Sequence, residues 1–173
     1  MEIRALREQD DRSAFRSGDP DLDRFFHKYA GQNQFRHHIG ATYVAVEGAR
    51  IAGYATVSPG HIESEQIAPG VLKKLPRYPL PILRLARLAV DESFRRQGAG
   101  EHLLRFVFRL ALEMASGFGC TGVVVDAKPG AEPFYRQYGF VSLDAVEGEA
   151  PARPQPVVMF LSLGEIEAVF KDA

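Results

Sequence analysis

The chain has one cysteine, no tryptophan and no long apolar run. A lone thiol, Cys120, excludes a framework of internal disulfides, and the lack of about 18 consecutive apolar residues excludes a membrane-spanning helix. No signal-peptide pattern precedes the polar start, so we expect a cytoplasmic protein without membrane association. The five histidines do not show the spacing of metal ligands, so no metal is expected. They are His27, His37, His38, His61 and His102.

A large charge of one sign is also absent, because the formal net charge is −1. The charge is unevenly distributed, however. The segment from residue 73 to residue 96 contains seven basic residues and only two acidic ones. A basic segment in a nearly neutral protein indicates a local anionic ligand, although any single lysine in it also fits a solvated surface. The basic residues are Lys73, Lys74, Arg77, Arg84, Arg87, Arg95 and Arg96.

With 173 residues, 46% of them hydrophobic, the chain suits one domain over residues 1–173. Apolar periodicity predicts an α/β fold with a mixed central sheet. A helix is expected after Asp19, with Leu22, Phe25, Phe26 and Tyr29 on its buried face. Strands are predicted at 3–6, 43–47, 51–58, 82–90, 122–127 and 157–161, and a further strand begins at Phe140. Helices are predicted at 99–115 and just before Gly139. The segment 59–81 is rich in proline and is expected to be a long loop with a short helix at 71–75.

The segment after Val90 combines basic residues with glycines and leads into a predicted helix. Helix N-termini carry unpaired N–H groups, and glycines allow close approach, so this turn favours a phosphate. It is not a nucleoside-triphosphate loop, because no Lys-Ser/Thr pair follows, and Leu103 occupies the third glycine position of a dinucleotide fingerprint. A plain tight turn is the alternative. The turn comprises Arg95, Arg96, Gln97, Gly98, Ala99 and Gly100.

A second motif, "PFYRQYGF", follows the next predicted strand. The order strand, Arg95-x-x-Gly98-x-Gly100, helix, strand, Phe134-Tyr135-x-x-x-Gly139-Phe140 resembles the GCN5-related N-acetyltransferase (GNAT) family. The resemblance implies a single-domain fold in which helices flank a mixed sheet with two splayed parallel strands. It also implies acetyl-coenzyme A as cosubstrate.

The same resemblance implies roles for individual residues. Residues 95–100 bind the pyrophosphate, and the pantetheine arm lies along Leu88, Ala89 and Val90, with Val125 and Asp126 on its far side. Tyr135 lies near the departing sulfur, where its hydroxyl can protonate the thiolate. Tyr138 is the internal comparison, expected to pack or to face solvent.

No general base stands out among Glu63, Glu65, Asp126 and Glu132. An α-amine has a pKa of roughly 7.7–8.0, against about 10.4 for lysine, so an α-amino acceptor needs only water as base.

A narrower resemblance covers residues 17–140. The stretches "SGDPDLDRFF", "TYVAVEGARIAGYATVS" and "PLPILRLARLAVDESFRRQGAGEHLL" are similar to acetyltransferase toxins of toxin–antitoxin modules. This implies aminoacyl-tRNA as acceptor, a small antitoxin partner and a homodimer. Lys73, Lys74, Arg77, Arg84 and Arg87 are the candidate tRNA contacts, and only one of Arg84 and Arg87 is expected at the cleft because they lie on opposite faces of an ideal strand. The alternatives are an acetyltransferase for a protein or small-molecule amine, and a non-catalytic coenzyme A sensor.

Overall fold

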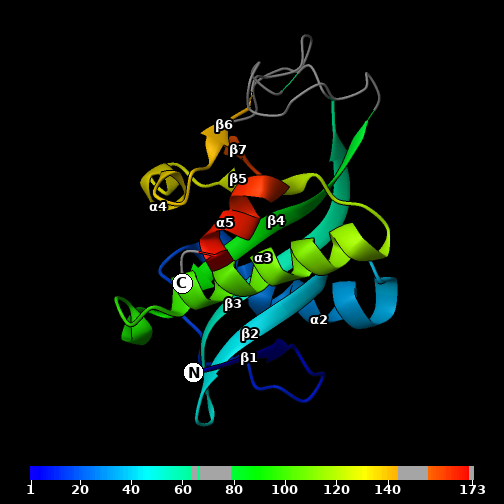
Figure 1. Ribbon diagram of the computed structural model, residues 1–173. Helices are drawn as coiled ribbons and strands as arrows, with labels where there is room; N and C mark the ends of the chain where they lie inside the picture. The colour runs from blue at the N-terminus through cyan, green and yellow to red at the C-terminus, as the bar shows by residue number, and fades with distance from the viewer. Residues whose placement is uncertain (64–65, 67–78, 144–155, 172–173) are drawn as a thin grey trace. The chain divides into compact units, whose positions relative to one another are not determined.

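The computed structural model describes residues 1–63, 66, 79–143 and 156–171 (Figure 1). The chain divides into two compact units. Unit 1 comprises Met1–Ser58 and Leu85–Arg109, and unit 2 comprises Pro59–Arg84 and Leu110–Ala173. The predicted helix at 71–75 lies outside the described residues, as do Glu65, Lys73, Lys74 and Arg77.

In the described ranges, seven strands form the mixed sheet of this α/β fold, in the order β1-β2-β3-β4-β5-β7-β6. In unit 1, β2 pairs antiparallel with both β1 and β3, and in unit 2, β7 pairs antiparallel with both β5 and β6. The strands are β1 (Glu2–Ala5), β2 (Ala41–Glu47), β3 (Arg50–Ile62), β4 (Leu80–Val90), β5 (Gly122–Ala127), β6 (Val141–Ser142) and β7 (Val157–Ser162).

Strand β3 extends beyond the predicted end at Ser58, so the expected excursion from Pro59 was placed too early. The reason is the burial of Ile62, which is 3% exposed and belongs to an apolar cluster in unit 2. Removing this side chain from water favours the extended conformation of the residues that lead to it. The other buried members of the cluster are Leu80, Ile82, Val124 and Phe160.

The first helical segment begins where the sequence predicts. The Asp19 carboxylate accepts hydrogen bonds from the amides of Asp21 and Leu22, at 2.9 and 3.2 Å, and thereby caps the helix. Two five-residue π-helical turns interrupt the segment, which is unusual because such turns are rare. The segment comprises α1 (Pro20–Arg24), η1 (Phe25–Tyr29), α2 (Ala30–Gln32) and η2 (Asn33–His37).

The π turn at η1 changes the buried face. The Ala30 amide bonds to the Phe25 carbonyl, five residues back, so the turn holds more residues than an α-helical turn. Phe25 and Phe26 are buried as expected, but Ala30 is buried in place of Tyr29, which is 44% exposed. The prediction for Tyr29 was therefore wrong, because it assumed an uninterrupted α-helical period.

Replacing Asp19 with alanine is expected to destabilise the protein by about 1 kcal/mol, because two amides of the first turn lose their acceptor. Thermal unfolding should show a melting temperature lower by about 2–4 °C. Asp21→Ala is the control, since Asp21 is exposed and its carboxylate pairs with Arg24 at the surface. Equal effects of the two substitutions would contradict the capping role.

The remaining helices are α3 (Ala99–Gly117), α4 (Glu132–Arg136) and α5 (Leu163–Lys171), with a 3₁₀ turn, η4 (Glu92–Phe94), before α3. Helix α3 buries Leu103, Val107 and Met114 of the predicted stripe. The residue after its end, Phe118, and Gly119, with a φ of +108°, both bond back to the Met114 carbonyl. Within the described ranges, no helix is both long and apolar enough to cross a membrane.

Candidate active site

The loop between β4 and α3 is fixed to the N-terminal segment of unit 1 by Asp91. Its side chain is buried and accepts hydrogen bonds from the Arg16 amide at 3.0 Å and from both the amide and the hydroxyl of Ser93. Burial alone would raise the pKa of this carboxyl, but these hydrogen bonds and the nearby Arg50 outweigh it and lower the pKa. Asp91 is therefore charged at neutral pH and holds the loop in place.

Replacing Asp91 with asparagine is expected to destabilise the protein at pH 7 by about 1.5–3 kcal/mol, the usual contribution of hydrogen bonds to a charged group. Because the folded-state pKa lies below the ordinary 3.8, this stabilisation exists above that pH and is lost as the pH falls through the lowered pKa. Thermal unfolding of native and variant protein should therefore differ at pH 7 and converge below pH 3.8. A difference that does not change with pH would contradict the role of the charge.

The side chain of Arg95 also secures this loop. Its guanidinium donates to the Ser17 carbonyl at 2.6 Å and lies 3.9 Å from the Glu92 carboxylate. A Cβ at Gly18, whose φ is +93°, would lie 2.9 Å from the same guanidinium, so glycine permits this close approach. The guanidinium of Arg95 therefore stabilises the loop through these two contacts.

The turn before α3 has the geometry of an anion cradle. Arg96 and Gly98 both adopt positive φ, at 63° and 83°, and α3 follows directly with 19 residues. The His102 amide bonds to the Gly98 carbonyl, so the amides of Ala99, Gly100 and Glu101 precede the first intrahelical bond. The three amides and the positive end of the helix dipole fit a pyrophosphate. The residues present therefore fit the coenzyme that the sequence implies.

The end of β4 lies against β3 at unusually close range. A Cβ at Gly53 would lie 2.8 Å from the Ala89 carbonyl oxygen and 3.0 Å from the Leu103 side chain. Ala89 is buried, whereas Leu88 and Val90 are half-buried. Glycine at position 53 thus permits this close approach to the backbone at which the pantetheine arm is expected, a role for Gly53 that the sequence did not indicate.

The two arginines of β4 make different contacts. Arg87, in unit 1, lies over the Phe25 ring at 3.8 Å, a favourable cation–π distance. Arg84, in unit 2, donates to both carboxylate oxygens of Asp126 at 2.8 and 2.9 Å. Asp126, one of the candidate bases, is therefore already engaged by a guanidinium.

Tyr135 lies on α4 in unit 2 and is 5% exposed. Phe134 and Phe140 pack edge-on against its ring, with centroids at 5.1 and 5.5 Å. Burial raises the pKa of the phenol above its usual value of 10.0, so the hydroxyl keeps its proton at neutral pH. No hydrogen bond from this hydroxyl to another described residue is seen. The hydroxyl is thus a neutral donor.

Two other acidic candidates lie in the described residues. Glu132 is in the first turn of α4, and the backbone amide of Glu63 donates to the side-chain oxygen of Gln66 at 2.9 Å. Over the described ranges, no group of histidine, cysteine or acidic residues is arranged to hold a metal ion.

The half-buried Tyr138 packs on Phe134, with the two ring centroids 5.6 Å apart.

The acetyltransferase (GNAT) domain family matches residues 38–142. The chain belongs to the GNAT acetyltransferases. The resemblance that the two motifs indicated is confirmed, and the protein is an N-acetyltransferase with acetyl-coenzyme A as donor.

Among the relatives of this GNAT protein is a tRNA-acetylating toxin of Mycobacterium tuberculosis, 31% identical over 140 residues, which cover 79% of this chain and 82% of the relative. A solved structure of AtaT complexed with acetyl-methionyl-tRNAfMet is 24% identical and shares the fold, with a TM-score of 0.83 over 98% of each chain. A crystal structure of KacT, in a mutant with one tyrosine changed to phenylalanine, is 26% identical, with a TM-score of 0.80 over 98% of this chain and 100% of that one.

Proposed function

We propose that this GNAT protein transfers the acetyl group of acetyl-coenzyme A to the α-amine of aminoacyl-tRNA and thereby blocks translation. The observation that carries the proposal is the relative named as a tRNA-acetylating toxin, which matches about four fifths of both chains. The fold shared with the tRNA-bound AtaT structure is consistent with it.

The coenzyme supplies an activated acetyl thioester. In the proposal, the amides of Ala99, Gly100 and Glu101 bind its pyrophosphate, and Arg96, exposed in the same turn, adds positive charge. Gln97 lies between the two positive-φ residues and completes the turn. Leu88, Ala89 and Val90 carry the backbone along which the pantetheine arm is aligned. A backbone amide near Ala89 or Val90 stabilises the negative charge that develops on the carbonyl oxygen.

Tyr135 is proposed as the general acid. When the amine attacks the carbonyl carbon, the carbon–sulfur bond breaks and the leaving thiolate needs a proton. The Tyr135 phenol is protonated at neutral pH, so its hydroxyl can supply that proton to the sulfur, and solvent returns a proton to the phenol before the next turnover.

The acceptor amine can lose its proton to water. An α-amine with a pKa of roughly 7.7–8.0 is already partly neutral at physiological pH. Asp126 does not act as base in this proposal, because both of its carboxylate oxygens accept from Arg84. Direct tRNA contacts by Lys73, Lys74, Arg77, Arg84 and Arg87 stay a prediction.

The proposed substrate also determines where and with what the protein acts. Aminoacyl-tRNA is consumed by ribosomes, so the protein acts in the cytoplasm. A toxin of this kind requires a small antitoxin that neutralises it, and we expect the enzyme to be a homodimer.

Cell-free translation tests the proposed outcome. Added enzyme is expected to stop protein synthesis only when acetyl-coenzyme A is present, and fresh aminoacyl-tRNA should restore synthesis once the enzyme is removed. An acetyltransferase for a protein or small-molecule amine, or a non-catalytic coenzyme A sensor, would leave translation unchanged.

A further inference from the structure

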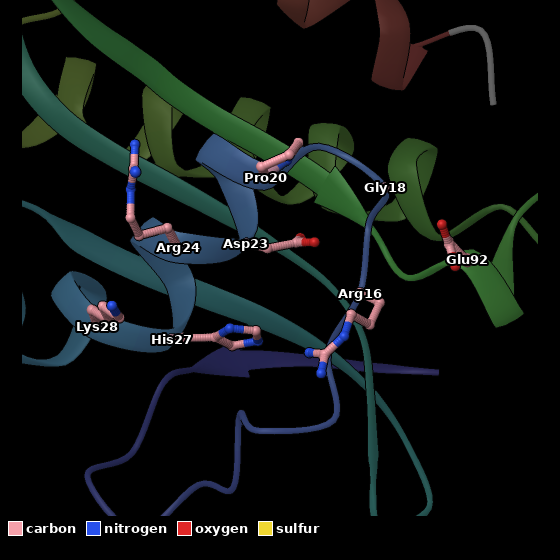
Figure 2. Close-up of a pocket in the computed structure, with 8 residues that line it drawn as sticks. All are labelled: Arg16, Gly18, Pro20, Asp23, Arg24, His27, Lys28 and Glu92. Atoms are coloured by element: carbon pink, nitrogen blue, oxygen red, sulfur yellow. The ribbon is translucent and has the colours of Figure 1, made fainter.

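Two neighbouring depressions on unit 1 share a pair of basic side chains, Arg16 and His27. The larger measures about 560 Å³, and Figure 2 shows the side chains around it. The smaller measures about 360 Å³. The larger is lined by Arg16, Gly18, Pro20, Asp23, Arg24, His27, Lys28 and Glu92, and the smaller by Asp10, Asp11, Arg12, Ser13, Arg16 and His27.

Arg16 and His27 are held side by side by one acceptor. The Phe15 carbonyl accepts from Arg16 Nη1 at 3.0 Å and from His27 Nε2 at 2.9 Å. Because a carbonyl only accepts, His27 Nε2 carries the hydrogen, and Nδ1 can donate to a phosphate oxygen when the ring carries its second proton. Figure 2 shows the guanidinium and the imidazole pointing toward each other. Arg16 Nη1 also donates to the Ser13 carbonyl at 3.1 Å, so the guanidinium is held in place and its Nη2 and Nε hydrogens face a ligand.

Four carboxylates line the depressions, and each has a partner other than Arg16 or His27. Asp11 accepts from the Ser13 hydroxyl at 2.6 Å, and Glu92 lies 3.9 Å from the Arg95 guanidinium. Asp23 accepts from both the amide and the hydroxyl of Ser17, at 2.9 and 2.6 Å. Asp10 forms a two-bond pair with Arg4, at 2.8 and 2.9 Å. Exposed Lys28 adds another positive charge to the larger depression. Among the described residues, none of these carboxylates forms an ion pair with Arg16 or His27.

We propose that Arg16 and His27 form a phosphate-binding site for the RNA backbone of the acceptor, an inference that rests on the proposed function. A planar guanidinium fork fixed in place matches a phosphate with two parallel hydrogen bonds. Two adjoining depressions that share the pair also suit a ligand with successive phosphates. A carboxylate-rich peptide is the competing occupant, and the test separates the two.

The test measures tRNA binding by fluorescence anisotropy against salt concentration. The double variant Arg16→Gln with His27→Gln is expected to bind tRNA about tenfold more weakly, and its salt slope should fall by roughly 1. Arg16→Lys keeps the positive charge but loses the planar guanidinium, so this variant should show the native salt slope and only part of the native affinity for tRNA. Arg109→Gln, which removes an exposed arginine of α3, is the charge-matched control.

A second readout uses an acceptor without RNA, the methyl ester of the accepted amino acid. The double variant should acetylate this ester as fast as native enzyme, while its KM for aminoacyl-tRNA rises about tenfold. Equal losses with both acceptors would assign the pair a structural role and overturn the inference. The inference would also be overturned if the double variant bound tRNA as tightly as the Arg109→Gln control does. It would be overturned too if the double substitution weakened binding of a poly-glutamate peptide and left tRNA binding unchanged.

The two proposals fail in different ways. Native enzyme that binds tRNA through Arg16 and His27 without acetylating it would overturn the proposed function and support this site. Native enzyme that acetylates aminoacyl-tRNA regardless of the double substitution would overturn this site alone.

Discussion

Replacing Tyr135 with phenylalanine is expected to lower kcat by about 10²–10⁴-fold, the usual contribution of general acid catalysis. The substitution removes one hydroxyl and leaves the ring packing with Phe134 and Phe140 in place. The fold and the affinity for acetyl-coenzyme A should therefore survive. Because the proton is needed only as the thiolate leaves, the loss should appear in kcat more than in KM. Steady-state kinetics at saturating coenzyme measure both constants.

Tyr138→Phe is the matched control for this experiment. Tyr138 is half-buried, follows α4 by two residues and packs on the same Phe134. This variant should keep most of the native activity. If Tyr135→Phe also turns over at nearly the native rate, Tyr135 is only a packed aromatic and another group supplies the proton.

Replacing Gly100 with glutamate is expected to weaken coenzyme A binding by about 100-fold or more. The substitution places a carboxylate on the second residue of α3, beside the amides that are proposed to bind the pyrophosphate. Like charges in contact cost several kcal/mol, and each 1.4 kcal/mol changes affinity about tenfold. Isothermal titration calorimetry with coenzyme A measures the effect directly.

Gly117→Glu controls for the cost of the same substitution elsewhere on α3. Gly117 is the last residue of that helix, and a Cβ there meets no atom within 4 Å. This variant should bind coenzyme A as the native protein does. Unchanged coenzyme affinity in the Gly100→Glu protein, with the fold intact, would rule out the anion site at the start of α3.

Much of the fold is predictable because local signals agree with the tertiary contacts. Asp19 followed by Pro20 is a strong start signal, and the structure shows the carboxylate capping two amides. The apolar stripe of α3 and the buried strand β5 follow the periodicity in the same way.

Other features depend on contacts that are distant in sequence or on irregular turns. The π turn that exposes Tyr29 includes a bond between Ala30 and Phe25, for which the local pattern gives no signal. Strand β3 continues to Ile62 because that side chain packs against residues of three other strands. Helix α5 was not predicted, since its nine residues directly follow β7 without a separating turn.

In the candidate site, too, some features could be predicted from the sequence and others could not. The glycine spacing of residues 95–100 and the position of Tyr135 are visible in the sequence, since both belong to compact motifs. The buried carboxylate of Asp91 depends on the Arg16 amide, 75 residues away, and the close approach at Gly53 depends on a neighbouring strand. The Arg16–His27 pair likewise depends on a shared carbonyl, which no sequence pattern reveals.

Incubating the enzyme with radiolabelled acetyl-coenzyme A and a pool of charged tRNA shows which molecule accepts the acetyl group. We expect label on aminoacyl-tRNA, released by mild alkali as an N-acetyl amino acid, and none on tRNA that was deacylated beforehand. Label on protein or on a small amine, with the charged tRNA unlabelled, would overturn the proposed function.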